Sequence, residues 1–223
     1  MHIEPGIVNG AKMILGFATA AGVGLWTVKL AAQTAVERGL HSLAARSALA
    51  TVATFAFFQV LPHYPVGVSE VHLILGSTLF LLFGAAPAAI GLAMGLLLQG
   101  LFFAPLDLPQ YGMNVTTLLL PLFAVSALAK RIVAPGTAYV DLAYAQVLKM
   151  SVAYQGGVVA LVAFWAFWGQ GVSATTLASV GAFGAAYMLV VILEPLVDLA
   201  VLAGAKAMRG LKGSPVVSER LYA

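Results

Sequence analysis

The sequence is dominated by long apolar runs, separated only by short stretches that contain Gly, Pro or charged residues. Seven runs can be distinguished, at residues 10–32, 44–61, 71–84, 87–104, 113–131, 142–168 and 174–204. A transmembrane helix needs about 20 apolar residues, and only the run at 71–84 is clearly short of that length. Charged residues make up 9% of the chain, against about 25% in soluble domains. We therefore expect an all-α, polytopic transmembrane bundle of about seven spans, with residues 1–223 forming one domain in the lipid bilayer.

The positions of Lys and Arg predict the orientation of these spans. Cytoplasmic loops of membrane proteins are enriched in basic residues. With an odd number of spans and the N-terminus outside, the first and third connections on the inner side and the C-terminal tail carry basic residues: Arg38, Arg46, Lys130, Arg131, Lys206, Arg209, Lys212 and Arg220. The sequence thus predicts an N-out, C-in topology. The net charge of +3 follows from this orientation and gives no reason to expect nucleic acid as a partner.

The N-terminus has the composition of a metal chelator. Met1 to Gly6 lack the basic and apolar stretches of a signal peptide, so we expect the mature chain to begin at Met1. The Met1 amine, the deprotonated His2 backbone nitrogen and His2 Nδ1 can then close a five-membered and a six-membered ring around one cation. Nitrogen-rich square sites favour Ni(II) or Cu(II), and nitrogen ligands can also hold Co(II). The alternative is that His2 is simply a residue near the N-terminus.

A fourth nitrogen ligand must come from another histidine, because the chain contains no cysteine. His41 falls in a basic inner loop, on the wrong side of the membrane. His63 and His72 fall on the outer side, and His72 enters an apolar run, so that its imidazole can point into the bundle.

Several motifs in the first 120 residues resemble those of the CbiM/NikM family. They are Met1-His2-Ile3 with Gly6, the stretch from Pro65 to Leu73 that contains Glu70 and His72, Gln99, and Gly112-Met113-Asn114. Members of this family are the membrane-embedded substrate-binding (S) components of energy-coupling factor importers for cobalt and nickel. The order Glu4-Pro5-Gly6 and the stretch Val68-Ser69-Glu70 depart from the usual family pattern, which leaves the choice between Ni(II) and Co(II) open.

The resemblance implies a site in which residues 1–9 fold into the bundle from outside and bind Ni(II) or Co(II) as the transported substrate. Its metal ligands map to Met1, His2 and His72. It also implies partners: a transmembrane coupling subunit, two ATPase subunits and often a small accessory membrane protein, in the bacterial inner membrane. The chain itself has no Gly-x-x-x-x-Gly-Lys-Ser/Thr phosphate loop, and we expect no enzymatic activity and no organic cofactor.

Two further sets of polar residues receive expected roles. Ser69, Gln99 and Asn114 are candidates to orient the imidazoles through their free ring nitrogens, although interhelical hydrogen bonds are the alternative for Gln99 and Asn114. Lys149 lies about 28 Å below the outer end of the sixth run at 1.5 Å per residue. We expect it to pair with Glu194 or Asp198 near the cytoplasmic boundary.

A gradient-driven secondary transporter or channel for a divalent cation is the alternative function. Single-component nickel/cobalt permeases typically carry a His-x-x-x-x-Asp-His stretch, whereas Ser77 stands five residues after His72. An intramembrane hydrolase is disfavoured, because Ser77 is poorly placed to pair with His72 as a nucleophile and base.

Overall fold

A computed structural model describes residues 2–208, and over this range the chain forms seven α-helices. The helices are α1 (Met13–Arg38), α2 (Leu40–Gln59), α3 (Gly76–Phe83), α4 (Ala85–Phe102), α5 (Tyr111–Ile132), α6 (Tyr144–Gln170) and α7 (Ala174–Ala207). Three short 3-10 helices, η1 (Gly10–Lys12), η2 (Pro105–Gln110) and η3 (Tyr139–Asp141), and a hairpin of β1 (Tyr64–Val66) and β2 (Ser69–Val71) connect them. The expected all-helical bundle is therefore present.

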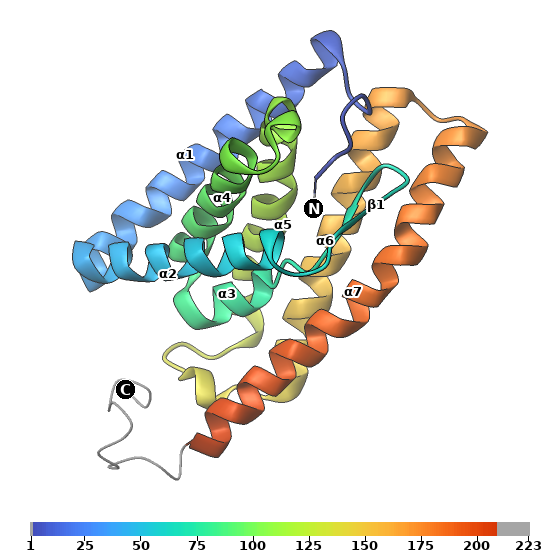
Figure 1. Ribbon diagram of the computed structural model, residues 1–223. Coiled ribbons are helices and arrows are strands. Elements are labelled where there is room, and N and C mark those ends of the chain that lie inside the picture. The colour runs from blue at the N-terminus through green and yellow to red at the C-terminus, as the bar shows by residue number, and fades with distance from the viewer. Residues whose placement is uncertain (1, 209–223) are drawn as a thin grey trace.

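Five helical stretches in this range are long and apolar enough to cross a membrane. They are Gly10–Arg38, Ala85–Phe102, Pro105–Ile132, Tyr144–Gln170 and Ala174–Ala207. Figure 1 shows that the α1–α2 connection, the α5–α6 connection and the end of α7 lie towards the lower left. The start of α1, the α4–α5 connection and the α6–α7 connection lie at the opposite, upper right end. Successive long helices therefore run in alternating directions.

The apolar run at 71–84 is not a continuous helix, in contrast to the expected third span. After β2 the chain is irregular from His72 to Leu75. Helix α3, which is eight residues long, begins after this segment. Eight residues rise about 12 Å, too little for a bilayer core of about 30 Å. Irregular backbone is tolerated at membrane depth where protein surrounds it, and here Ile74 and Leu75 are both buried.

The hairpin that precedes this irregular segment lies against α7. Its strands are antiparallel, with Tyr64 opposite Val71 and Val66 opposite Ser69. Gly67 turns the chain with a positive φ of 64°, a conformation that favours glycine. A Cβ atom at Gly67 would lie 2.2 Å from the Ser179 carbonyl oxygen of α7. The hairpin therefore approaches this helix too closely for any larger residue at its turn.

Small residues bring α2 and α4 into close contact. A Cβ atom built on Gly91 would lie 2.4 Å from Ala50 Cβ, and one on Gly95 would lie 2.6 Å from Thr54 Cβ. Small residues at four-residue spacing let helix backbones approach closely in membranes. The pair Ala50 and Thr54 therefore serves packing within the bundle.

Candidate metal centre

The N-terminal segment runs into the bundle beside the hairpin, as Figure 1 shows. Ile3 forms an antiparallel bridge with Ser69. Two backbone hydrogen bonds flank the bridge, from Glu4 N to Val68 O at 3.1 Å and from Glu70 N to His2 O at 3.0 Å. Because the segment pairs with the hairpin edge, the side chains of His2 and Ile3 are buried, with exposures of 2% and 1%.

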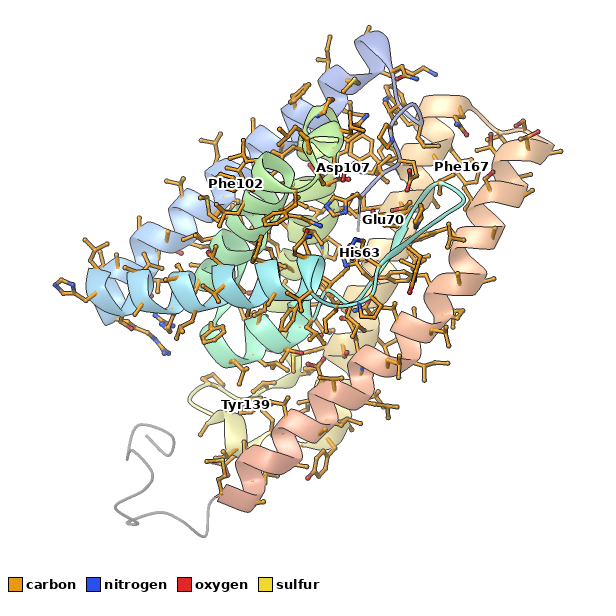
Figure 2. All side chains as sticks on the ribbon, viewed as in Figure 1. His63, Glu70, Phe102, Asp107, Tyr139 and Phe167 are labelled. Atoms are coloured by element: carbon orange, nitrogen blue, oxygen red, sulfur yellow. The ribbon has the colours of Figure 1, made fainter. Side chains whose placement is uncertain are left out.

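This pairing brings His2 next to Glu70 and His72. His2 Nδ1 lies 2.5 Å from Glu70 Oε2, and the ring centroids of His2 and His72 are 5.6 Å apart. Each of the three side chains offers a ligand atom within 4.8 Å of the other two, and no second such group of His, Cys, Asp or Glu occurs within residues 2–208. Figure 2 labels Glu70 on the hairpin, facing the centre of the bundle.

The protonation of the His2–Glu70 pair suits a metal ligand. Burial lowers the pKa of His2, although the hydrogen bond to Glu70 opposes this shift. Burial alone would raise the pKa of Glu70, but the hydrogen bond and charge of His2 lower it below its usual value. Neutral histidine is the form that binds metal, so the lowered pKa of His2 favours ligation. Binding through Nδ1 would require that nitrogen to be deprotonated and would replace its contact with Glu70.

A backbone carbonyl oxygen positions the ring of His72 through Nδ1. His72 Nδ1 lies 3.0 Å from the carbonyl oxygen of Leu73. A carbonyl oxygen can only accept a hydrogen bond, so Nδ1 is the donor in this contact. The ring of Phe58 packs on both imidazoles, at centroid distances of 4.7 Å from His72 and 6.1 Å from His2. The two histidines therefore meet in a buried and partly apolar enclosure.

The polar residues expected around the imidazoles bind other atoms. Ser69 Oγ donates to the His2 carbonyl oxygen at 2.7 Å, and Asn114 Oδ1 accepts from Ile3 N at 2.8 Å. Both side chains therefore bind backbone atoms of the N-terminal segment. The segment pairs with the hairpin on one side and contacts α5 on the other. Gln99 Nε2 donates to the Phe58 carbonyl oxygen at 3.3 Å, an interhelical hydrogen bond between α4 and α2.

Two groups of expected residues lie outside the described range. Met1, the expected first ligand, precedes it, and the tail residues Arg209, Lys212 and Arg220 follow it. The two other histidines are elsewhere: His41 is exposed at the start of α2, and His63 Nδ1 contacts the Leu61 carbonyl oxygen at 3.1 Å.

The expected ion pair of Lys149 is absent from the part of the chain that the structure describes, where the one close contact between a basic and an acidic side chain is that of His2 with Glu70. Lys149 is exposed on α6, whereas Glu194 and Asp198 are buried in α7, with exposures of 0% and 1%. The two carboxylates instead accept hydrogen bonds from uncharged groups of α3, of α6 and of the segment before α3. Neutral donors therefore satisfy them.

Glu70 is the site residue that the sequence analysis missed. It was considered only as a neighbour of His72 at the start of a helical run, and two residues apart on a helix point in different directions. In extended chain, by contrast, residues i and i+2 face the same side, and here Glu70 lies in β2, which ends at Val71, directly before His72. The spacing Glu-x-His would have indicated the cluster if this stretch had been assigned to a strand.

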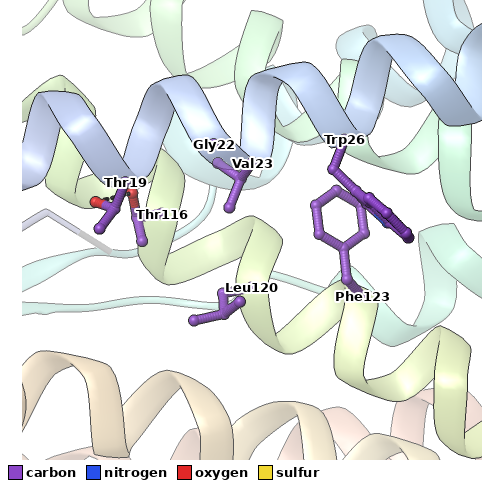
Figure 3. Close-up of a pocket in the computed structure, with 7 residues that line it drawn as sticks. All are labelled: Thr19, Gly22, Val23, Trp26, Thr116, Leu120 and Phe123. Carbon is purple, nitrogen blue, oxygen red and sulfur yellow. Dashed lines mark hydrogen bonds between the residues drawn. The ribbon is translucent and has the colours of Figure 1, made fainter.

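An apolar pocket of about 380 Å³ lies between α1 and α5, away from this cluster (Figure 3). Its only polar side chains are Thr19 and Thr116, whose hydroxyl groups hydrogen-bond to each other at 2.9 Å. The pocket therefore offers no metal ligand. A second, narrow pocket is lined by His2, Asp107 and Asn114 together with apolar residues.

Comparisons with known proteins agree with this description. The sequence profile of the CbiM family, described as the cobalt uptake substrate-specific transmembrane region, matches residues 2–210. A crystal structure of a transition metal transporter superposes with a TM-score of 0.69 at 16% identity, covering 97% of this chain and 96% of the other. A truncated transition metal transporter superposes with a TM-score of 0.68 at 17% identity, covering 91% and 97%. At such identities the two structures establish the fold alone. No curated protein matches the sequence.

Proposed function

Because this chain belongs to the CbiM family of substrate-specific transmembrane components for cobalt uptake, we propose that the His2–Glu70–His72 cluster is where its cation binds. The chain is a multi-pass membrane protein and a transport component, and its family is not one of enzymes. The observation that carries the proposal is the meeting of His2 and His72, 70 residues apart in sequence, in one buried site.

The proposed ligands are the Met1 amine, the His2 backbone nitrogen, His2 Nδ1 and His72 Nε2, with residues 1–9 as the chelating segment. Three nitrogens from the N-terminus and one imidazole form a set that suits Co(II) or Ni(II). Chelation through His2 Nδ1 replaces the hydrogen bond to Glu70. The Glu70 carboxylate then lies beside the cation and balances part of its charge.

Acidic residues near the N-terminal segment support a route for a cation from the outer side. Asp107 lines the narrow pocket together with His2, and in Figure 2 it lies at the α4–α5 connection, towards the end of the bundle where α1 begins. A mouth lined by one sign of charge raises the local concentration of the opposite ion. We expect this end of the bundle to face the outer side of a bacterial inner membrane.

The energy for uptake has to come from other subunits, because the sequence has no phosphate-binding loop for ATP. We propose a transmembrane coupling subunit and two ATPases as partners, with a small accessory membrane protein as a possible fourth component. Transport of Co(II) by the purified chain alone in liposomes would instead support the alternative, a gradient-driven secondary transporter.

The ligand set can be tested at the first atom of the chain. Adding one Gly before Met1 turns the Met1 amine into an amide, which is a poor ligand until it is deprotonated, and moves the free amine out of the chelate ring. We expect the extended protein to insert normally but to lose tight binding of Co(II) and Ni(II), measured by calorimetry and by metal analysis of the purified protein. A tag after Ala223 is the control, because it leaves the N-terminus unchanged. Equal affinity of the extended and native proteins would refute the N-terminal chelate.

A further inference from the structure

One peptide group joins a buried carboxylate of α7 to the proposed ligand His72. Its N–H, at Ile74, donates to Glu194 Oε1. Its carbonyl oxygen, at Leu73, accepts from His72 Nδ1 at 3.0 Å. The hydrogen bonds therefore run in one direction, from the imidazole through the Leu73–Ile74 peptide group to the carboxylate of Glu194.

Glu194 is arranged as an acceptor on both of its oxygens. Besides the Ile74 N–H at Oε1, the amide Nε2 of Gln155 donates to Oε2. Gln155 is held in this orientation by Tyr187, whose hydroxyl donates to Gln155 Oε1 at 2.8 Å. All three side chains are fully buried. Each oxygen of Glu194 therefore accepts from a different part of the chain, one from the segment before α3 and one from α6.

The position of this carboxylate has a consequence for His72. A carboxylate that accepts from a peptide N–H polarises the peptide, and hydrogen bonds in such a chain strengthen one another in a low-dielectric interior. The Leu73 carbonyl oxygen thereby becomes a better acceptor for His72 Nδ1–H. Histidines that bind metal commonly donate their second ring N–H to a carboxylate or a carbonyl, which fixes the tautomer and raises the basicity of the ligating nitrogen.

We propose that Glu194 is a positioning residue for the metal site, which acts through the Leu73–Ile74 peptide group to hold His72 with Nδ1 protonated and Nε2 directed to the metal. This role rests on the proposed function, because it assumes that His72 is a ligand. It also explains why a carboxylate is buried in a membrane-spanning helix without a basic partner within the described residues. Such residues are costly in a membrane and usually functional.

Asp198 provides a matched control one turn further along α7. It is also buried, with an exposure of 1%, and it accepts from two hydroxyl groups of α3, Ser77 Oγ at 2.6 Å and Thr78 Oγ1 at 2.5 Å. Its hydrogen bonds anchor the first turn of α3 and do not reach the peptide group next to His72. Replacing its carboxyl group by an amide should therefore perturb packing as much as the same change at Glu194, but should leave the orientation of His72 unchanged.

The experiment compares Glu194→Gln with Asp198→Asn in the full-length protein. We expect Glu194→Gln to weaken binding of Co(II) and Ni(II) by about 10- to 100-fold, the usual range for residues that orient a metal ligand, and Asp198→Asn to change it less than about threefold. The second readout is the ¹⁵N NMR spectrum of the histidine side chains before metal is added, with His72 assigned from the spectrum of His72→Ala. The native protein and Asp198→Asn should show His72 as the single Nδ1–H tautomer, and Glu194→Gln should show a mixture of both tautomers.

Equal losses of affinity in the two variants, or an unchanged tautomer of His72 in Glu194→Gln, would overturn the proposal. If the native protein bound neither metal, the proposed function would fail. The tautomer measurement needs no metal, so it would still decide whether Glu194 orients His72, and the two failures can be told apart.

Discussion

His72 and His41 are the same side chain in opposite surroundings. His72 is 2% exposed, packed against Phe58 and held through Nδ1 by the Leu73 carbonyl oxygen. His41 is exposed at the start of α2. Only His72 combines a ring held in one orientation with neighbours suited to a metal site. A comparison of variants at His72 and His41 therefore separates loss of a ligand from a general effect of losing an imidazole.

Replacing His72 by Ala should lower the affinity for Co(II) by more than about 100-fold, since it removes a ligand and not a residue that orients one. Replacing His41 by Ala should leave the affinity unchanged. Titration calorimetry measures both, and the yield of folded protein in detergent shows whether insertion is intact. Similar losses at both positions would point to misfolding and against a ligand role for His72.

At the residue scale, the sequence predicted the two histidines better than their surroundings. Topology excluded His41 but left both His63 and His72, and the resemblance to the CbiM/NikM family implied His2 and His72 as ligands, a role that stays a prediction. Ser69 and Asn114 were chosen for their polarity, but which atoms they bind depends on the strand pairing of Ile3 with Ser69. That pairing joins segments far apart in sequence, and no local pattern indicates it.

At the scale of elements, apolar periodicity located the long helices within a few residues, because hydrophobic length decides a membrane span. It failed at 71–84. The chain there is apolar enough for a helix, yet the backbone leaves the helical conformation: Leu75 has a positive φ of 55°, uncommon for a residue other than glycine. The Ile74 N–H, which has no partner in a helix here, donates instead to Glu194, 120 residues away. Such a distant partner cannot be read from the local sequence.

The contact between α2 and α4 should be sensitive to the size of one residue. Gly95 lies where a Cβ atom would meet Thr54, whereas nothing lies within 4 Å of a Cβ atom at Gly156 of α6, a residue that is exposed. Gly95→Leu should therefore lower the free energy of unfolding by about 1–3 kcal/mol or more through overpacking. Gly156→Leu should change the free energy of unfolding little, and the higher helix propensity of Leu acts in the stabilising direction.

Thermal or denaturant unfolding in detergent micelles measures this difference between the two variants. Both changes add the same side chain to a membrane helix, so effects of hydrophobicity on insertion cancel. Equal stabilities would mean that α2 and α4 do not pack through Gly95 as the structure describes.

At the scale of the whole molecule, the basic residues at helix ends agree with the arrangement of the helices. Arg38 ends α1, Lys130 and Arg131 lie in the last turn of α5, and Lys206 lies in the last turn of α7. These three ends lie on one side of the bundle in Figure 1. Because basic residues favour the cytoplasmic side, this side should face the cytoplasm, and the N-terminal segment with its metal cluster should open to the outside.

The absence of cysteine from the sequence makes this orientation directly measurable. A single cysteine at Val172, in the α6–α7 connection, should react with a membrane-impermeant maleimide in cells with an intact inner membrane and a permeabilised outer membrane. One at Ala134, in the α5–α6 connection, should react only after the inner membrane is also permeabilised. Both positions are exposed, so a difference between them reports the side of the membrane and not burial. The reverse labelling pattern would place the metal cluster at the cytoplasmic side. A cation taken up from outside would then reach the cluster only after crossing the bundle. That result would contradict the proposed role of the cluster as the first binding site for uptake.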